Sequence, residues 1–224
     1  MVTGSLCAGV KGSKYGKPRK INPFKTMVQL TQLQIDVLVG TMLGDATMER
    51  AQINHSPRLR FEQTFPMHAA YLTNLYIIFM GLVGKHPTVV TREPDSRTGS
   101  IYSTIRFSTL AFPCLNYYFD LFHFMGKKVV PSNIVSLLTP QALAYWIMDD
   151  GEKGSYGEMI LHTRSFTFAD VQRLQDALAI NFSLRTRLIE KTPGQWVIVI
   201  PIKQSMPLKD IVSPYMCRSM LYKL

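Results

Sequence analysis

Two apolar stretches that each end in a carboxylate constrain the fold of this chain more than any other feature. Leu38–Ala46 has the sequence LVGTMLGDA, and Leu143–Gly151 has the sequence LAYWIMDDG. Both contain small residues, and in both an Asp is followed by Ala or Gly. One stretch of this kind is common, but two in one chain, with similar elements after each, indicate a duplicated unit.

The residues in front of each stretch predict that it is helical. Thr31 is followed three residues later by Gln34, which is a capping-box pattern. Thr139 suits an N-cap, and Pro140 suits the first helical position, where its missing N–H has no cost. We therefore expect the two motif helices at 33–44 and 143–150.

Small residues predict that the two motif helices cross closely. Gly40 and Gly44 are four residues apart and share one helix face, and Ala144 and Met148 have the same spacing in the second stretch. Two backbones can nearly touch where helices present such faces. The crossing would bring the C-terminal ends of both helices to one place.

At that place we expect Asp45 and Asp150 to lie together. Two carboxylates this close resist ionising unless a cation lies between them. Hard oxygen ligands without a His or Cys cluster favour Mg²⁺ over Zn²⁺. The alternative is that each Asp is only a solvated residue at a helix end, where the helix dipole disfavours it. The presence of two motifs weighs against that alternative.

On these motifs the chain resembles the LAGLIDADG homing endonucleases, in their monomeric two-motif branch. The segment LTPQALAYWIMDDG is typical of that branch. The first motif departs from the pattern at Thr41 and Leu43 but keeps Asp45, and the resemblance covers roughly Leu30 to Leu224. It implies a site-specific, intron-encoded enzyme of an organelle, mitochondrion or chloroplast. Such an enzyme hydrolyses both strands of a long, asymmetric DNA target.

Hydrophobic periodicity between the motifs predicts two αββαββα units of mixed α/β (α+β) class. Together they would form a saddle of antiparallel strands with the motif helices packed at its centre. We expect a basic flexible arm, a first unit, a linker and a second unit at 1–29, 30–126, 127–139 and 140–224. In the first unit we expect strands at 48–55, 58–65, 88–92 and 100–108 and helices at 67–82 and 115–125. In the second we expect two strands within 152–164, two more at 185–190 and 195–200, and helices at 168–181 and 208–216.

The charge balance indicates a polyanionic partner. A net charge of +10 and a pI of about 9.6 favour nucleic acid, although a generally basic protein is the alternative. The three cysteines have no metal spacing, and HExxH, HNH, P-loop and GxGxxG patterns are absent from the sequence. No apolar run reaches the roughly 18 residues of a membrane span. The basic arm could lie along phosphates, or it could equally be a targeting or vector-derived remnant.

Planar donors on the polar strand faces are candidates for reading bases in the major groove. Arg suits guanine, and Gln or Asn suits adenine. Taken singly, a side chain of this kind is more often a solvated surface residue than a base-reading one, but the set as a whole favours DNA contact. In the first unit the candidates are Arg50, Gln52, Asn54, Arg58, Arg60, Arg92, Tyr102, Thr104 and Arg106. In the second unit they are Lys153, Tyr156, His162, Arg164, Arg185, Arg187 and Gln195.

The resemblance also implies a catalytic machinery around the two Asp residues. The backbone carbonyls of Ala46 and Gly151 would join them as metal ligands. A catalytic lysine is expected in each half, at Lys128 and Lys223. Lys127 is the competing position for the first, and an ordinary surface lysine is the alternative for the second. The implied ion is Mg²⁺, with Mn²⁺ as a substitute and Ca²⁺ binding without supporting cleavage.

Family members also carry a Gln after the strand that faces the active site, and Gln63 fits this position. The corresponding place in the second half is expected to hold Arg164, which would make cutting of the two strands unequal. Two rival functions belong to the same family resemblance. One is an RNA-binding maturase that assists splicing of its own intron, and the other is a DNA-binding regulator. The intact acidic residues and lysines favour the nuclease.

Overall fold

The computed structural model describes residues 23–224, so most of the predicted basic arm lies outside the described residues. What is described of the arm begins with the short helix α1 (Pro23–Met27). No helix among residues 23–224 is long and apolar enough to cross a membrane.

The first unit has the predicted order of elements. Its core packs on the motif helix α2 (Gln32–Leu43) and on α3 (Ala69–Phe79), which continues as a 3₁₀ turn at Met80–Leu82. The last helix is α4 (Asn116–Phe122). The strands are β1 (Thr47–Glu49), β2 (Arg58–Phe65), β3 (Thr88–Thr91) and β4 (Ser103–Ser108). They form an antiparallel sheet of order β1-β2-β4-β3.

The second unit repeats this topology. Its helices are α6 (Pro140–Asp150), α7 (Phe168–Phe182) and α8 (Ser205–Val212). Its strands are β7 (Gly151–Lys153), β8 (Met159–His162), β9 (Arg187–Thr192) and β10 (Gln195–Ile200). They pair in the order β7-β8-β10-β9, the same order as in the first sheet. The predicted duplication of an αββαββα unit is therefore confirmed.

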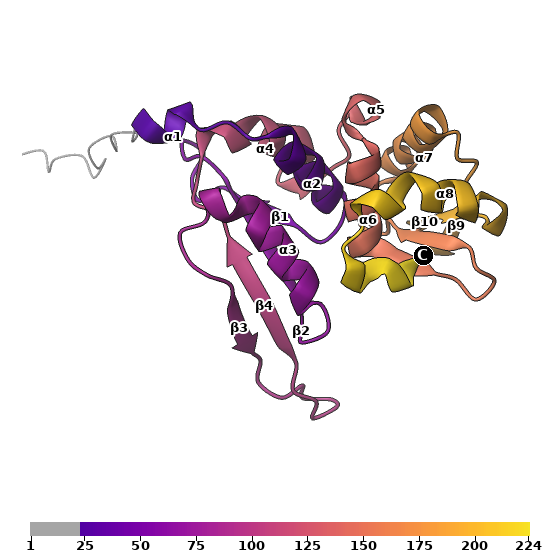
Figure 1. The fold of residues 1–224 in the computed structure, drawn as a ribbon, viewed down its shortest axis with the longest axis horizontal. Helices are drawn as coiled ribbons and strands as arrows, with labels where there is room; N and C mark the ends of the chain where they lie inside the picture. Colours follow the sequence, from indigo (N-terminus) through magenta and orange to yellow (C-terminus); the bar gives the residue numbers. More distant parts are fainter. Residues whose placement is uncertain (1–22) are drawn as a thin grey trace, which may run out of the picture.

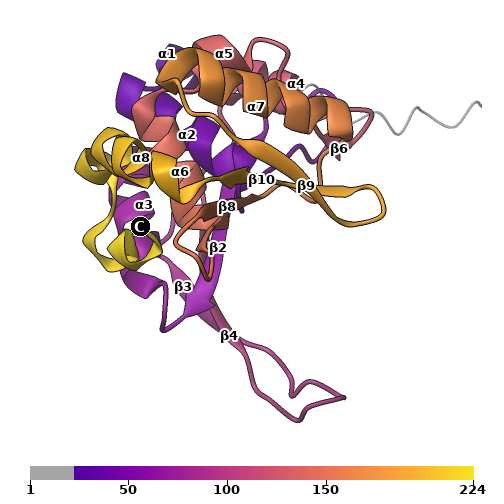
Figure 2. The same cartoon turned by 90° about the vertical axis from the view of Figure 1, so that its right-hand side faces the viewer.

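The two units lie side by side, with α2 and α6 at the junction (Figure 1). Turned by 90°, helices α4, α5 and α7 gather on one side of the molecule and the strands lie below them (Figure 2). The end of the chain returns to the junction, where the 3₁₀ segment η5 (Arg218–Lys223) contacts α3 and α6. The two units are therefore joined by the central pair of helices α2 and α6 and by the C-terminal segment.

The caps predicted from the sequence are present. The Thr31 side chain accepts a hydrogen bond from the Gln34 amide, and the Gln34 side chain caps Thr31 in return. Thr139 accepts from the amide of Ala142, with Pro140 at the first helical position of α6. These caps satisfy backbone groups that would otherwise have no partner at the helix start.

The close crossing of the motif helices is confirmed, but the partners on α6 differ from those predicted. A Cβ added to Gly40 would lie under 3.0 Å from the Ala142 carbonyl oxygen and from Cβ of Tyr145. A Cβ on Gly44 would clash in the same way with the Asp149 side chain. The prediction that Ala144 and Met148 form this face is wrong, because the face of a helix that meets its neighbour depends on how the helix is rotated.

Several predicted elements end earlier than expected, among them the helix at 208–216, which ends at Val212. The strand at 48–55 and the helix at 115–125 do so for local reasons. The strand expected at 48–55 ends at Glu49, because the turn-forming residues that follow lead directly into β2. The helix expected at 115–125 ends at Phe122. Met125 and Gly126 have positive φ angles of 49° and 75°, which close a hairpin between β5 (His123–Phe124) and β6 (Lys127–Lys128). The predicted linker also contains a short helix, α5 (Ile134–Leu137).

The second sheet lacks the fully polar face that was expected. In β10, Ile198 and Ile200 pack into the core, but Val197 and Val199 on the opposite face are also buried. Val199 pairs with Ile160 and Arg187 on the neighbouring strands. The saddle face of the second unit is therefore apolar at its middle and polar at its margins.

Candidate active site and nucleic-acid interface

The two motif helices end beside each other and carry one exposed and one half-buried carboxylate. Asp45 follows α2 and is exposed, and Asp150 is the last residue of α6. Burial, followed by the negative charge of Asp45, raises the pKa of Asp150 to about 7, against the opposing charges of Lys128 and Lys223. The structure thus brings the two predicted carboxylates into electrostatic contact.

Two lysine side chains close the C-terminal ends of the motif helices. Nζ of Lys128 donates to the carbonyls of Gly44 and Ala46 at 2.6 and 3.0 Å. Nζ of Lys223 donates to the carbonyls of Met148 and Asp149 at 2.6 and 2.9 Å. Each ammonium group satisfies carbonyls that the helix leaves free at its negative end.

These contacts distinguish the predicted lysines from their alternatives. Lys127 is exposed, whereas Lys128 is turned into the site, and Lys223 is buried rather than a surface residue. Burial lowers the pKa of both Lys128 and Lys223, and the surrounding carboxylates oppose that shift. The carbonyl of Ala46, a predicted metal ligand, accepts from the ammonium group of Lys128. Gly151, the other residue with a predicted carbonyl ligand, is the first residue of β7.

Gln63 on β2 is buried and reaches the same place. Its Nε2 donates to Oδ2 of Asp45 at 3.0 Å and lies 3.4 Å from Oδ1 of Asp149. Its Oε1 lies 3.1 Å from Nδ1 of His68. The structure therefore joins Gln63 directly to one of the two predicted metal ligands.

The predicted counterpart of Gln63 in the second half is wrong. With Asp45 and Asp150 taken as equivalent, the pairings of β1 with β2 and of β7 with β8 align Gln63 with Thr163. Thr163 is buried, and its hydroxyl donates to the carbonyl of Trp196. Arg164 comes one residue later, in an exposed turn. The error is a shift by one residue, which moves a side chain to the other face of a strand.

Sequence reasoning missed Asp149, which lies half-buried between the motif helices. Its Oδ2 accepts the backbone N–H of Asp45 at 3.1 Å, and its Oδ1 accepts the hydroxyl of Tyr71 at 2.8 Å. Burial and the Asp45 charge raise the pKa of Asp149 well above its ordinary range. The sequence held a signal, because Asp149 occupies the motif position that holds Gly44 in the first copy.

Most of the predicted DNA-contacting side chains are exposed on the strands or at their turns. Arg50, Arg60, Thr104 and His162 are half-buried. Arg50 packs over the ring of Phe119 and bonds to Asn116 and Asp120 of α4. The exposed candidates without an ion pair among residues 23–224 are Gln52, Asn54, Tyr102, Arg106, Lys153, Tyr156, Arg164, Arg185, Arg187 and Gln195. Lys153 among them bonds to the carbonyl of Leu224.

Several other candidates are held by carboxylates on the same face. Arg58 and Arg60 pair with Glu49 at 2.6 and 3.3 Å. Glu62 accepts from Arg60, Arg92 and Thr104 at 2.6, 3.3 and 2.9 Å. In the second sheet His162 lies 2.6 Å from Glu152. These contacts preorganise the side chains but offset part of their charge.

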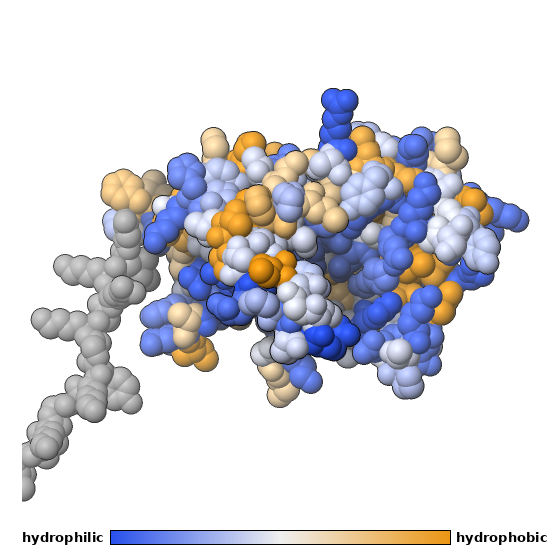
Figure 3. All heavy atoms as spheres, turned by 90° about the horizontal axis from the view of Figure 1, so that it is seen from below, coloured by the Kyte–Doolittle hydropathy of each residue, from blue (hydrophilic) through white to orange (hydrophobic). Residues whose placement is uncertain are grey.

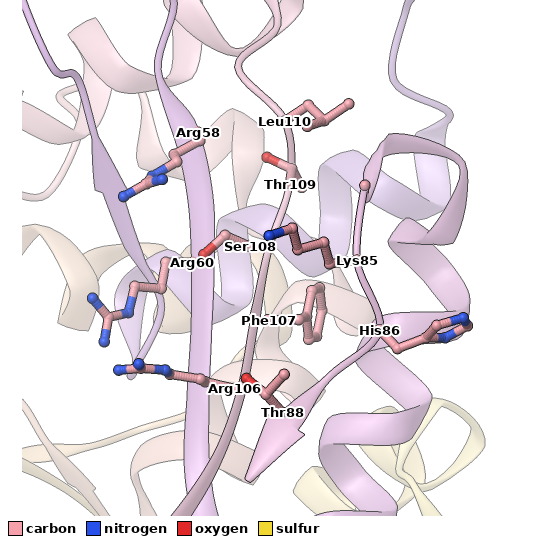
Figure 4. Close-up of a pocket in the computed structure, with 11 residues that line it drawn as sticks. Arg58, Arg60, Lys85, His86, Thr88, Arg106, Phe107, Ser108, Thr109 and Leu110 are labelled. Carbon is pink, nitrogen blue, oxygen red and sulfur yellow. The ribbon is translucent and has the colours of Figure 1, made fainter. Parts of the chain in front are cut away.

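A cationic hollow of about 440 Å³ lies over the start of β3. Arg58, Arg60 and Arg106 extend to one side of the sheet, and Lys85 reaches over Ser108 from the loop before β3 (Figure 4). Hydrophilic side chains dominate the face of the molecule seen from below, with scattered hydrophobic patches between them (Figure 3). This face has the character expected of a surface that contacts phosphates.

A duplicated αββαββα fold whose two motif helices end in carboxylates, next to a cationic hollow, is the architecture expected of a two-motif DNA endonuclease. The sequence profile of the LAGLIDADG DNA endonuclease family matches residues 35–208. The chain therefore belongs to the LAGLIDADG DNA endonuclease family.

Individual relatives agree with this assignment. Probable intron-encoded endonuclease 1 of Wickerhamomyces canadensis is 31% identical over 210 residues, which are 89% of this chain and 87% of that protein. Cytochrome b mRNA maturase bI2 of Debaryomyces hansenii is 32% identical over 199 residues, 87% and 74% of the two chains. The homing endonuclease I-WcaI bound to its DNA recognition sequence has a TM-score of 0.82 and 26% identity, covering 92% of this chain and 95% of that one.

The predicted fold and the predicted activity of a site-specific DNA endonuclease are thus confirmed. Endonucleases of this family generally depend on a divalent metal.

Proposed function

We propose that the chain acts as a monomer and cuts both strands of a long, asymmetric DNA site, with Mg²⁺ between Asp45 and Asp150. The observation that supports this proposal most directly is the junction, where two carboxylates and the ammonium groups of Lys128 and Lys223 meet at the ends of α2 and α6. The two halves differ in sequence on their strands, where Arg60 and Glu62 of β2 align with Ile160 and His162 of β8, so we expect a target that is not a palindrome. By family resemblance the protein is encoded in an intron and acts in an organelle.

The donor set fits Mg²⁺. Among residues 23–224 no cluster of three or more His, Cys, Asp or Glu could enclose an ion. Mg²⁺ is commonly held by one or two carboxylates and keeps water and phosphate as its other ligands. Asp45 and Asp150 would hold it, with the carbonyls of Ala46 and Gly151 nearby. When bound, the ion activates water and neutralises charge on the phosphate.

The chain's own residues supply positioning and charge. Lys128 and Lys223 fix the ends of the motif helices and place positive charge beside the reacting phosphates. Gln63 donates to Asp45 and can orient a water molecule there. Mn²⁺ should replace Mg²⁺, whereas Ca²⁺ should bind without supporting cleavage.

The test is selection of cut ends from a randomised duplex DNA library in Mg²⁺, with Asp150→Asn in parallel. We expect a long asymmetric consensus from the unaltered protein. The variant should lose cleavage and keep binding to that sequence, since the carboxamide keeps the size of the carboxylate but not its charge. Full cleavage by Asp150→Asn would contradict the assignment, and binding without cleavage by the unaltered protein would favour a DNA-binding regulator.

A second candidate is an intron RNA maturase, favoured by the similarity to the Debaryomyces hansenii maturase. The distinguishing measurement is binding of the host intron RNA in the presence of excess duplex target. RNA binding that survives this competition would establish an RNA site separate from the saddle. Loss of RNA binding would leave the nuclease as the function.

A further inference from the structure

Gln63 is held from behind by a chain of side chains that begins in the other half of the molecule. The hydroxyl of Tyr222 lies 3.3 Å from Nε2 of His68. Nδ1 of His68 lies 3.1 Å from Oε1 of Gln63, whose Nε2 donates to Asp45 at 3.0 Å. His68 immediately precedes α3 of the first unit, whereas Tyr222 lies in η5 at the end of the second.

The chemistry of these groups sets the direction of every hydrogen bond. Gln63 uses its amide NH₂ for the Asp45 carboxylate, so its carbonyl oxygen faces His68 and can only accept. Nδ1 of His68 must then carry the proton, and Nε2 of the neutral ring accepts from the Tyr222 hydroxyl. Burial and the charge of Lys223 lower the pKa of His68, which agrees with a neutral ring.

The hydrogen-bonded chain from Tyr222 through His68 to Gln63 is present in one half of the site and has no counterpart at the Gln63-equivalent position of the other half. The position equivalent to Gln63 is Thr163, whose hydroxyl is engaged by the carbonyl of Trp196. Tyr222 is also the neighbour of Lys223, which closes α6. One short C-terminal segment thus contacts both halves. Lys223 bonds to the end of α6, and Tyr222 bonds to His68, which in turn contacts Gln63.

We propose that His68 and Tyr222 are positioning residues for Gln63, so that cutting of the strand at the Asp45 side depends on the contact of the Tyr222 hydroxyl with His68. The proposal rests on the proposed nuclease function and deepens it. Without the His68 donor, the carbonyl of Gln63 loses its partner, and its amide is held less firmly toward Asp45. The Asp150 side of the site has no equivalent of Gln63, so cutting there should not depend on His68 or on the Tyr222 hydroxyl.

The experiment measures cleavage of each strand separately, on a selected target whose two 5′ ends carry different labels, with protein in excess. The variants are His68→Ala, His68→Asn and Tyr222→Phe. Asn retains a donor near the position of Nδ1 and loses the contact with Tyr222. Tyr76→Phe is the matched control, because Tyr76 makes a similar bond to His86, remote from Asp45.

His68→Ala should slow one strand by about 10- to 100-fold, the range found when a catalytic group loses its orientation. The other strand should stay within about twofold, and the KM for DNA and the melting temperature should change little. His68→Asn should recover part of the rate, Tyr222→Phe should slow the same strand by a few-fold, and Tyr76→Phe should leave both strands unchanged.

Equal slowing of both strands, or an unchanged rate in both His68→Asn and Tyr222→Phe, would overturn the inference while the proposed function stood. These two variants keep the test valid should His68→Ala fail to fold. Absence of cleavage by the unaltered protein would overturn the proposed function and the inference together.

Discussion

The lysine ammonium group at the end of each motif helix has a structural and a chemical role. Lys128→Met should remove the donor to Gly44 and Ala46 and leave both carbonyls without a partner. We expect a loss of about 1–3 kcal/mol in the free energy of unfolding and a fall in cleavage rate of about 10²–10³-fold. Denaturant unfolding and single-turnover cleavage would measure the two effects.

Lys127→Met is the matched control, since the neighbouring side chain is exposed and makes none of these contacts. It should leave both stability and the cleavage rate nearly unchanged. If Lys127→Met slowed cleavage more than Lys128→Met, the assignment of the catalytic role to Lys128 would be wrong.

For single residues, the sequence predicted which side chains of the candidate site lie together, but not which partners hold them in place. Asp45, Asp150, Lys128, Lys223 and Gln63 were all named from motifs, and the structure brings them together. The partners that hold them could not be predicted, because they depend on helix rotation and strand register. Those partners are Asp149, Tyr71, His68 and Tyr222.

At the scale of elements, the crossing of α2 and α6 depends on the absence of side chains at two glycines. Gly40→Ala would place a Cβ against the Ala142 backbone, which cannot move without shifting α6. We expect the free energy of unfolding to fall by about 1–3 kcal/mol, as for other overpacked sites. Guanidinium unfolding would measure it.

Gly81→Ala is the control for this substitution. A Cβ at Gly81 meets nothing within 4 Å, and its φ is not in the left-handed region. The change should be neutral or stabilising by up to about 1 kcal/mol, through the lower entropy of the unfolded chain. Equal destabilisation by both substitutions would show that the helix crossing is looser than described.

The polar face of the first sheet predicts a pH dependence of stability. Partial burial works to raise the pKa of Glu62, but hydrogen bonds from Arg60 and Thr104, with the Arg60 charge, bring it below its ordinary value of 4.5. A carboxyl group whose pKa is lowered by folding stabilises the protein above its unfolded pKa. That contribution is lost as the pH falls through the lower, folded pKa.

Glu62→Gln should therefore destabilise the protein at pH 7, and the difference from the unaltered protein should shrink as the pH falls below 4.5. Unfolding curves from pH 7 downward would test this. Glu93→Gln is the control, because Glu93 is exposed and has no ion pair among residues 23–224. A difference for Glu62→Gln that stays constant with pH would contradict the ion-pair network.

Element types could be predicted from periodicity and caps, but only some of their ends and faces could. The 2-residue alternation of 58–65 predicted β2 to the residue, because Leu59 and Phe61 must face the core. The bounds of β10 were also predicted to the residue, but its faces were not, because both faces are buried and the sequence is apolar from Trp196 to Ile200. Its pattern alone does not show which valines face the core and which face the saddle.

In the whole molecule, some of the cationic side chains are paired with carboxylates, and others are free to contact phosphates. Arg58, Arg60 and Arg92 are engaged by Glu49 and Glu62. These arginines must exchange a carboxylate for a phosphate when DNA binds, so the net gain from each is reduced. Arg106 and Lys85 line the same hollow and have no ion pair among residues 23–224. They are therefore expected to contribute more to phosphate binding than the paired arginines do.

Arg106→Gln should weaken DNA binding by a similar factor on specific and non-specific duplexes, since a phosphate contact carries no base information. The slope of log K against log salt should fall by about one, because one fewer counterion is released. Arg58→Gln should change the slope less. Lys209→Gln, an equal change of charge on α8 outside the sheets, is the control. A slope for Lys209→Gln that falls as much as that for Arg106→Gln would mean that net charge, rather than the saddle, governs binding. A loss confined to the specific duplex would instead make Arg106 a base-reading residue.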